Sequence, residues 1–376
     1  MKVTFALWDL GRTGGARVIF EVANRLARKG YDVSIVGLRG MPYWFQLHVP
    51  CTKAYDLSGM PDWVARYLPH RIRSSALAGA SGCLCWRHQC RILAKNLPKS
   101  DISVATYFLT AFSVAMANRG IPFYYVQHYE PIFFSDTKFA KLAVATYNLP
   151  MNFLVVSRWL QDVLKERFDK QSTLVGNGVD HTIFNPSAPR VMLRKKPDEI
   201  IVMSFLRGMW WKGDNEFLLA VKEVATQLSN VRFILIGRRA LLGHFQKLIP
   251  DIRGIPITIF EEPTDRQLSS VYASSDIFVS SSWYEGFSLP PLEAMACGTP
   301  VITTDSLGVR DYVVHEKNAI VVPPKQPSIL ARAIIQLIKD DQLRKELSKN
   351  GLDTAKKFSF DKVAEKVERA FLDAMS

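Results

Sequence analysis

The sequence lacks a long apolar segment. Its longest stretch without a charged residue, residues 102–118, is shorter than a bilayer-spanning helix and contains Thr106, Thr110, Ser113 and Asn118. Residues 1–8 alternate like a β-strand and include neither an apolar signal core nor a small-residue cleavage site. We therefore expect no transmembrane helix and a cytoplasmic location. Residues 102–118 are predicted to form a buried strand followed by a helix.

Cysteine is scarce, with five residues in a chain of 376. In a cytosolic chain of this size we expect them to be reduced. Cys83, Cys85, His88 and Cys90 lie close together, but their spacing matches no standard zinc module. Buried thiols on a helix are the favoured interpretation, and a zinc site is the alternative.

Acidic residues are absent from residues 63–100, where basic residues are interleaved with aromatic and leucine side chains. The formal net charge is +13, and residues 1–180 carry most of it, a net +10. Such a stretch suits peripheral contact with an anionic membrane, or an acidic acceptor. A solvated helix face in a basic protein explains it equally well. No nucleic-acid-binding module is present, so we expect no nucleic acid as a partner.

The length and the order of predicted elements favour an α/β fold of two domains. Strands alternate with helices in both halves, a pattern that produces parallel sheets with helices on both faces. We expect two Rossmann-like domains, residues 1–180 and residues 181–357, whose parallel sheets face a deep cleft. A C-terminal helix within residues 358–376 is expected to cross back onto the N-terminal domain. The predicted strands span residues 2–8, 32–36, 102–106, 123–127, 153–157, 200–205, 232–236, 257–260, 277–280, 301–304 and 319–322.

Two glutamates separated by seven residues are the most informative feature. Glu285 follows an apolar strand, so it is expected in a loop at the carboxyl edge of a parallel sheet, where α/β proteins bind ligands. Pro290 and Pro291 suit a first helical turn and Gly298 a helix end, which places Glu293 in the first turn. There the helix dipole favours a carboxylate, which suits a ribose, whereas Glu285 suits the hydroxyl groups of a sugar. The alternative is a Glu293 that caps its own helix and a solvent-exposed Glu285. Because the prolines have no N–H, backbone donors for a sugar are expected from Gly286, Phe287, Ser288 and Leu289.

The segment EGFSLPPLEAMACGTPVI resembles the signature of the family-4 retaining glycosyltransferases of the GT-B fold. Residues 155–157 and 176–180 look like the inter-domain passage of that family, and Arg207 and Lys212 look like its diphosphate-binding pair. Two cations beside a helix start would neutralise the charge that develops on a departing nucleoside diphosphate. Ordinary exposed loop charges are the alternative. The chain contains no Asp-x-Asp motif, which argues against a divalent cation as clamp, so we expect no metal and no cofactor besides the nucleotide-sugar co-substrate.

Three residues of the first half complete the predicted site. Gly14 and Gly15 look like the glycine-rich loop of the family, which approaches the donor phosphates and the acceptor, although a tight structural turn explains them as well. His128 follows a predicted strand and matches a family histidine near the reacting sugar, with an ordinary loop residue as the alternative. Residues 127–131 are also similar to rhamnosyltransferases of surface-polysaccharide assembly, in which an acidic residue often stands at the position of His128.

The resemblance implies a retaining glycosyltransferase that moves a sugar from a nucleoside-diphosphate sugar to a saccharide or lipid-linked acceptor. No side chain stands out as a covalent nucleophile, so we favour attack from the face of the leaving group. The predicted catalytic residues are His128, Glu285, Arg207 and Lys212. The alternatives are another GT-B enzyme, such as a sugar-nucleotide epimerase or a phosphorylase, and a nonenzymatic protein that binds anionic lipid. The nucleotide base, the sugar and the acceptor are left open.

Overall fold

The computed structural model describes residues 1–54, 82–134, 137–189 and 196–376. Its contacts divide the chain into two units. Unit 1 comprises Met1–Gly176 together with Phe360–Ser376, and unit 2 comprises Asn177–Ser359. These limits lie within a few residues of the expected boundaries. Residues 63–81, which make up half of the basic stretch of residues 63–100, lie outside the described residues.

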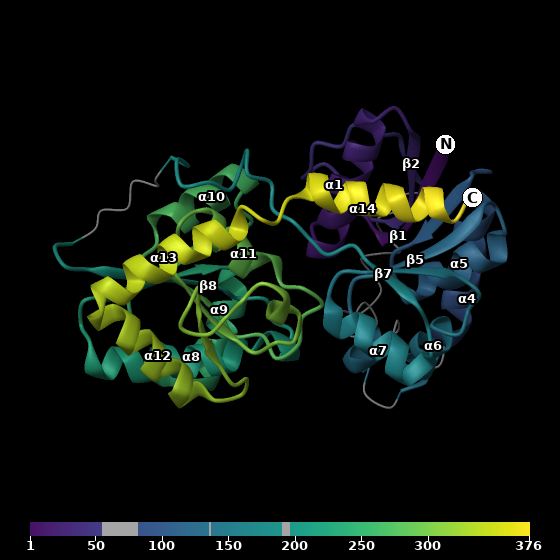
Figure 1. Ribbon diagram of the computed structural model, residues 1–376. Coiled ribbons are helices and arrows are strands. Elements are labelled where there is room, and N and C mark those ends of the chain that lie inside the picture. Colours follow the sequence, from purple (N-terminus) through teal and green to yellow (C-terminus); the bar gives the residue numbers. More distant parts are fainter. Residues whose placement is uncertain (55–81, 135–136, 190–195) are drawn as a thin grey trace. The chain divides into compact units, whose positions relative to one another are not determined.

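Unit 1 is built on a seven-stranded sheet in the order β3-β2-β1-β4-β5-β6-β7, and every neighbouring pair is parallel (Figure 1). The four residues of β4 are all buried, as expected for a central strand covered on both faces. Two short edge strands, β3 and β7, were not predicted, because three residues are too few to show a period. The strands are β1 (Lys2–Asp9), β2 (Asp32–Arg39), β3 (Cys51–Lys53), β4 (Ile102–Ala105), β5 (Ile121–Val126), β6 (Asn152–Val155) and β7 (Ser172–Leu174).

The helices of unit 1 begin and end where the local sequence favours it. The Thr13 side chain accepts a hydrogen bond from Ala16 N and so caps α1, and Gly30 follows this helix with a φ of 88°. The predicted strand and helix within residues 102–118 are confirmed as β4 and α5. The helices are α1 (Gly14–Arg28), α4 (Gly82–Asn96), α5 (Phe108–Ala117), η2 (Glu130–Phe134), α6 (Lys138–Thr146), α7 (Arg158–Phe168) and α14 (Phe360–Asp373).

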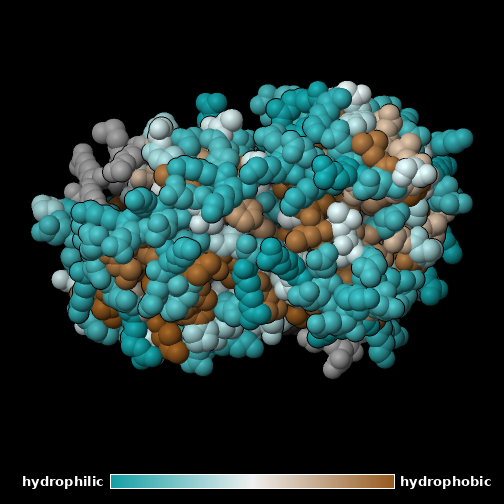
Figure 2. Space-filling model, in the orientation of Figure 1, coloured by the Kyte–Doolittle hydropathy of each residue, from teal (hydrophilic) through white to brown (hydrophobic). Residues whose placement is uncertain are grey.

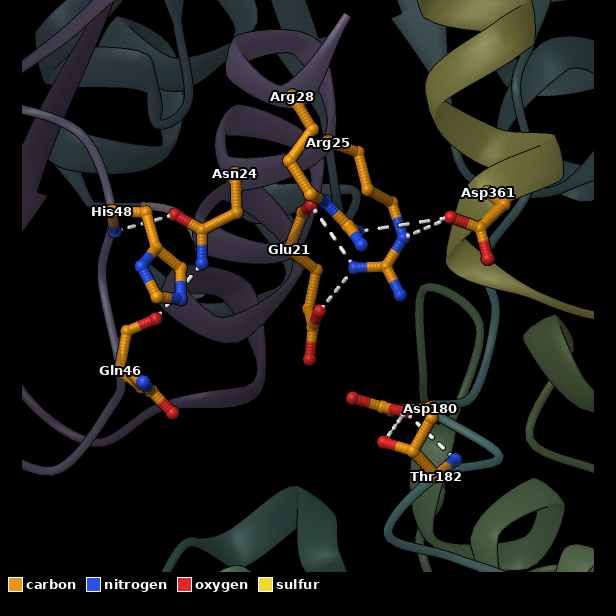
Figure 3. A network of polar contacts seen from close by, with 9 residues as sticks. All are labelled: Glu21, Asn24, Arg25, Arg28, Gln46, His48, Asp180, Thr182 and Asp361. Atoms are coloured by element: carbon orange, nitrogen blue, oxygen red, sulfur yellow. Dashed lines mark hydrogen bonds and ion pairs between the residues drawn. The ribbon is translucent and has the colours of Figure 1, made fainter.

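The C-terminal helix α14 packs against α1, although more than three hundred residues separate them in the sequence (Figure 1). Arg25 on α1 lies between Glu21 and Asp361, and its Nε donates to Asp361 Oδ1 at 2.9 Å (Figure 3). Its guanidinium also lies 5.5 Å from the centre of the Phe360 ring. Glu368 pairs with Lys29, which lowers the pKa of that carboxyl. The helix thus joins unit 1 through both charge and apolar contact.

Unit 2 contains a six-stranded parallel sheet in the order β10-β9-β8-β11-β12-β13. All residues of β11 and β12 are buried, and one apolar core links the sheet to the helices that cover it. The prediction of two α/β domains with parallel sheets is confirmed. The strands are β8 (Ile200–Phe205), β9 (Val231–Ile236), β10 (Ile257–Phe260), β11 (Ile277–Ser280), β12 (Val301–Thr304) and β13 (Ile320–Val322).

The helices of unit 2 pack against one another in pairs. Helix α8 packs against α12, and α11 packs against both α10 and α13. Thr264 and Gln267 form a capping box at the start of α10. The helices are η3 (Trp210–Lys212), α8 (Asp214–Gln227), α9 (Arg239–Leu248), η4 (Pro250–Ile252), α10 (Asp265–Ser274), α11 (Leu289–Ala296), η5 (Gly308–Asp311), α12 (Pro327–Lys339) and α13 (Asp341–Ala355).

Hydrophilic residues cover most of the face drawn in Figure 2, and hydrophobic residues appear there as separate patches. Within the described ranges, no helix combines the length and the apolar character needed to cross a bilayer. Cys51, Cys90 and Cys297 are free thiols, and Cys90 lies buried in α4, as the buried-thiol interpretation predicts for it. The side chains of Cys83 and Cys85 lie outside the described part of the structure.

Removal of the Phe371 ring should destabilise unit 1. This side chain is fully buried, and its ring centre lies 4.8 Å from that of Phe123 in β5. We expect Phe371→Ala to lower the free energy of unfolding by about 3–5 kcal/mol, measured by urea denaturation. Leu372→Ala, on the same helix with 49% of its surface exposed, is the control and should change it by less than about 1 kcal/mol. Equal effects of the two variants would contradict the observed docking of α14.

Candidate active site

The predicted residues of unit 2 lie beside the point where its strand order reverses. Strands β8 and β11 are neighbours in the sheet but are separated in the sequence by β9 and β10. Arg207 and Lys212 follow β8, and Glu285 follows β11. Ligands of open α/β sheets bind in the crevice outside the strand ends at such a reversal. The topology therefore places both loops at a binding edge.

The loops after β8 and β11 are in direct contact. A Cβ atom on Gly213 would lie 2.0 Å from Ser281 O, so only glycine permits this approach. Gly213 also has a φ of 66°. The Ser281 hydroxyl donates to Lys212 O at 3.0 Å, and Trp283 N donates to Trp211 O at 2.7 Å. These contacts fix the two loops relative to each other.

Lys212 and Glu285 form an ion pair in which Nζ lies 2.7 Å from Oε1. The Lys212 side chain is 22% exposed and that of Glu285 13%, so the pair is largely shielded yet open to a ligand. Glu285 N donates to Ser306 O at 2.9 Å. A Cβ atom on Gly308 would lie 2.5 Å from the backbone of Gly286. The 306–308 loop therefore packs directly against the segment that carries Glu285. A positive and a negative group are thus held together at the edge.

Arg207 lies among acidic side chains. Desolvation lowers its pKa, while the nearby carboxylates of Glu293, Glu285 and Asp214 oppose that change. Although much of Arg207 as a whole is exposed, its guanidinium is crowded by these groups and lies 4.1 Å from the centre of the Phe205 ring. The structure therefore brings Arg207 into the electrostatic surroundings of both predicted glutamates.

Asp214 was not among the predicted residues. Its Oδ2 accepts hydrogen bonds from the backbone N–H groups of Arg207 and Gly208, and burial raises its pKa. It thereby shapes the turn that carries Arg207. The sequence offered only the weak signal of an acidic residue next to Lys212 and Gly213.

Glu293 is buried, but its expected place in the first helical turn is wrong. Helix α11 begins at Leu289, because Ser288 already turns the chain with a φ of 71°, and Glu293 is the fifth helical residue. The dipole argument is correspondingly weaker. Instead, the hydroxyl of Tyr272 donates to Glu293 Oε2 at 3.2 Å. This glutamate is held by a side chain of α10, a contact that the sequence did not indicate.

Residues 286–289, from which the sequence predicts backbone N–H groups that bind a sugar, are tightly packed. Phe287 is buried and stacks on Tyr312 with ring centres 5.1 Å apart. The Tyr312 hydroxyl donates to Ser288 O at 2.6 Å, which fixes the left-handed turn before α11. Gly286 and Leu289 are also buried. Buried packing and one hydrogen bond therefore fix this segment at the start of α11.

In unit 1, Gly14 and Gly15 are the first residues of helix α1 and do not form a preceding turn as predicted. Thr13 caps the helix directly before Gly14, so both glycines lie in its first turn. A Cβ atom on Gly15 would lie 3.3 Å from Gln127 Oε1, so the glycine start of α1 faces the residue next to His128.

His128 follows β5 and is surrounded by aromatic side chains that the sequence did not indicate. Its ring centre lies 4.3 Å from that of Phe133 and 6.1 Å from that of Trp159. Its carbonyl oxygen accepts a hydrogen bond from the Tyr147 hydroxyl at 3.5 Å. Both ring nitrogens are shielded from solvent.

Glu130, two residues beyond His128, is buried and was not assigned a role by the sequence. Its Oε2 accepts hydrogen bonds from Phe108 N at 2.9 Å and from the Tyr124 hydroxyl at 2.6 Å. It therefore ties η2 to the start of α5 and to β5. Burial raises its pKa to about 8, and the two hydrogen bonds act in the opposite direction.

A metal site finds no support in the part of the chain that the structure describes, because no group of three or more His, Cys, Asp or Glu side chains is arranged to hold an ion there. The cations next to the candidate carboxylates are Lys212 and Arg207.

Two α/β units, each built on a parallel sheet, and a carboxylate and cation cluster at the strand reversal of unit 2 are features typical of enzymes of the GT-B class. The family model "Glycosyl transferases group 1" matches residues 189–354, and the model "Glycosyltransferase Family 4" matches residues 12–183. The chain therefore belongs to the family-4 glycosyltransferases of the GT-B fold.

Individual relatives agree with the family. The O-antigen biosynthesis protein RfbC of Myxococcus xanthus is 25% identical over 278 residues, which cover 74% of this chain but 21% of that protein. The sucrose-phosphate synthase of Thermosynechococcus elongatus superposes with a TM-score of 0.78 at 19% identity, over 100% of both chains. Anabaena HepE, solved in complex with UDP-glucose, superposes with a TM-score of 0.74 at 18% identity, over 99% of this chain and 100% of that one. At these identities the solved structures establish the fold.

The packing of Gly308 provides a test of the support behind Glu285. Gly308→Ala would place a methyl group against the Gly286 backbone, and we expect a loss of about 1–3 kcal/mol in the free energy of unfolding. Gly243→Ala is the control, since nothing lies within 4 Å of its Cβ position in α9. It should stabilise by about 0.5–1 kcal/mol because alanine favours a helix. Urea denaturation distinguishes the two, and a neutral Gly308→Ala would contradict the close packing.

The raised pKa of Glu130 predicts a pH-dependent stability. From the ordinary value of 4.5 up to about 8, the folded protein holds a proton on Glu130 that the unfolded chain releases. The free energy of unfolding therefore falls as pH rises through this window, by at most about 1.4 kcal/mol per pH unit. Glu130→Gln stays neutral and should lose this dependence.

The measurement is urea denaturation at about pH 4 and about pH 9, on either side of the window. Relative to the wild type, Glu130→Gln should gain stability on going from the lower to the higher pH. Glu365→Gln, which replaces an exposed glutamate of α14, should follow the wild type. Parallel curves for wild type and Glu130→Gln would rule out a proton held by Glu130.

Proposed function

We propose that this enzyme transfers a sugar, with retention of anomeric configuration, from a nucleoside-diphosphate sugar to a saccharide or lipid-linked acceptor. The observation that carries the proposal is the Lys212–Glu285 pair beside Arg207 at the strand reversal of unit 2. An activated sugar has hydroxyl groups at one end and a doubly charged diphosphate beside them. A carboxylate next to two cations matches both parts.

In this proposal unit 2 holds the donor. Glu285 accepts hydrogen bonds from sugar hydroxyl groups, and Glu293 accepts them from the ribose. Arg207 and Lys212 neutralise the diphosphate, so no metal ion is required for that role. The backbone of residues 286–289 supplies donors to the sugar.

The proposed reaction breaks the bond between the anomeric carbon and the phosphate oxygen and forms a bond to an acceptor oxygen on the same face. The leaving phosphate takes the proton of the acceptor hydroxyl. As negative charge grows on that phosphate, Arg207 and Lys212 stabilise it more strongly than in the ground state. This is the step at which the two cations act as catalysts.

Unit 1 is proposed to serve the reacting sugar and part of the acceptor. His128 orients the sugar, and the glycine start of α1, Gly14 and Gly15, allows close backbone approach to phosphate and acceptor. The positive charge of the first 180 residues suits an anionic acceptor at the inner face of a membrane. The relative RfbC, named for O-antigen biosynthesis, supports a role in the assembly of a surface polysaccharide.

The donor class is tested by a thermal-shift screen against UDP, GDP, dTDP and their sugars, with and without a chelator. Because a ligand of the folded state raises the melting temperature, one nucleotide should produce a selective increase that the chelator leaves unchanged. HepE, solved with UDP-glucose, makes the uridine compounds the first choice. A flat response to every nucleotide would refute the proposal.

The roles of the two glutamates are tested by Glu285→Gln and Glu293→Gln, which remove the charge and keep the shape. Each should lower turnover of the identified donor by about a hundredfold. Glu346→Gln, on the exposed face of α13, is the matched control and should retain full turnover. Full activity of either site variant would exclude its assigned role. Conversion of the donor without any acceptor would instead identify an epimerase.

A further inference from the structure

Four aromatic side chains flank the Lys212–Glu285 pair, and we call them the aromatic rim: Trp210, Trp211, Trp283 and Tyr284. The Trp210 ring centre lies 5.5 Å from that of Trp211, 5.4 Å from that of Trp283 and 6.4 Å from that of Tyr284. Trp210 is therefore the centre of the rim.

The rim is fixed relative to the ion pair. Trp211 directly precedes Lys212, and Tyr284 directly precedes Glu285. The hydrogen bond from Trp283 N to Trp211 O joins its two halves. Lys325 Nζ lies 4.4 Å from the centre of the Trp283 ring, a cation–π contact that holds this indole in place.

Trp210 is 48% exposed, whereas the other three residues of the rim are half-buried. Single exposed apolar side chains are common on protein surfaces, but a cluster of aromatic rings bordered by charged groups is typical of binding sites. The exposed ring thus offers a flat apolar surface next to the cluster of charges.

We propose that the aromatic rim binds a sugar ring of the saccharide acceptor, with Trp210 as the stacking platform. The inference rests on the function proposed above. A pyranose has an apolar face of C–H groups and a polar edge of hydroxyl groups. An exposed indole suits the face. The neighbouring Lys212–Glu285 pair holds the donor in the proposed function, and an acceptor hydroxyl must come close to the anomeric carbon of that donor, so a ring on Trp210 lies on the side from which the acceptor attacks.

The position within unit 2 favours a sugar over a nucleotide base. The rim adjoins Glu285, at the proposed sugar end of the donor, whereas a base would lie toward Glu293 at the ribose end. A membrane surface fits less well, because a single exposed indole beside an ion pair is a poor anchor and Lys325 covers the neighbouring ring.

The test uses protein that contains fluorinated tryptophan, observed by fluorine NMR. The resonance that disappears in Trp210→Phe belongs to Trp210. The probes are disaccharides of hexose, 6-deoxyhexose and N-acetylhexosamine, titrated with and without the nucleoside diphosphate. At least one should shift the Trp210 resonance, and Trp210→Ala should weaken its binding roughly three- to tenfold.

Trp210→Phe keeps a ring and should bind with intermediate affinity, while Leu248→Ala, a change at an exposed side chain of α9, should leave the affinity unchanged. The nucleoside diphosphate should bind wild type and Trp210→Ala equally. If no disaccharide moves the Trp210 resonance, or vesicles of phosphatidylglycerol and phosphatidylethanolamine move it instead, the inference is overturned. Because nucleotide binding is measured separately, that result would leave the donor proposal standing.

Discussion

The candidate active site depends on the close approach of two loops in unit 2. Gly213 lies so near Ser281 that no larger residue fits, and the hydrogen bonds of the adjacent backbone hold that approach. The loop after β8 carries the cations and the loop after β11 carries Glu285. Because both loops are fixed to each other, the cation and the carboxylate are already held together before a ligand binds, which lowers the ordering cost of binding.

Shielded charge is the second feature of this site. Burial raises the pKa of Asp214 and desolvation lowers that of Arg207, so both groups carry their charge at some cost. Neighbouring groups offset this cost. Asp214 accepts hydrogen bonds from two backbone N–H groups, and Arg207 has carboxylates nearby. Charges arranged in this way need little rearrangement when charge develops on a substrate, which is the condition for strong electrostatic catalysis.

In unit 1 the predicted residue His128 lies close to Glu130, whose structural role only the tertiary structure reveals. Glu130 joins β5, η2 and the start of α5, and it lies two residues from His128. The histidine ring itself is enclosed by Phe133 and Trp159. The ring of His128 is therefore positioned by aromatic packing, while Glu130 holds the segment that follows it. Helix α14 completes the unit through Arg25 and Phe371.

The sequence by itself determined the fold class and most of the elements, because strand and helix periods, glycine stops and the spacing of Glu285 and Glu293 are local properties of the chain. It also placed the predicted residues at strand ends, since parallel strands share one carboxyl edge. Only the tertiary structure decided the start of α11, the Tyr272 contact of Glu293 and the gathering of Trp210, Trp283 and Lys325. These depend on segments far apart in the sequence, whose meeting is set by the packing of the whole unit and leaves no local pattern.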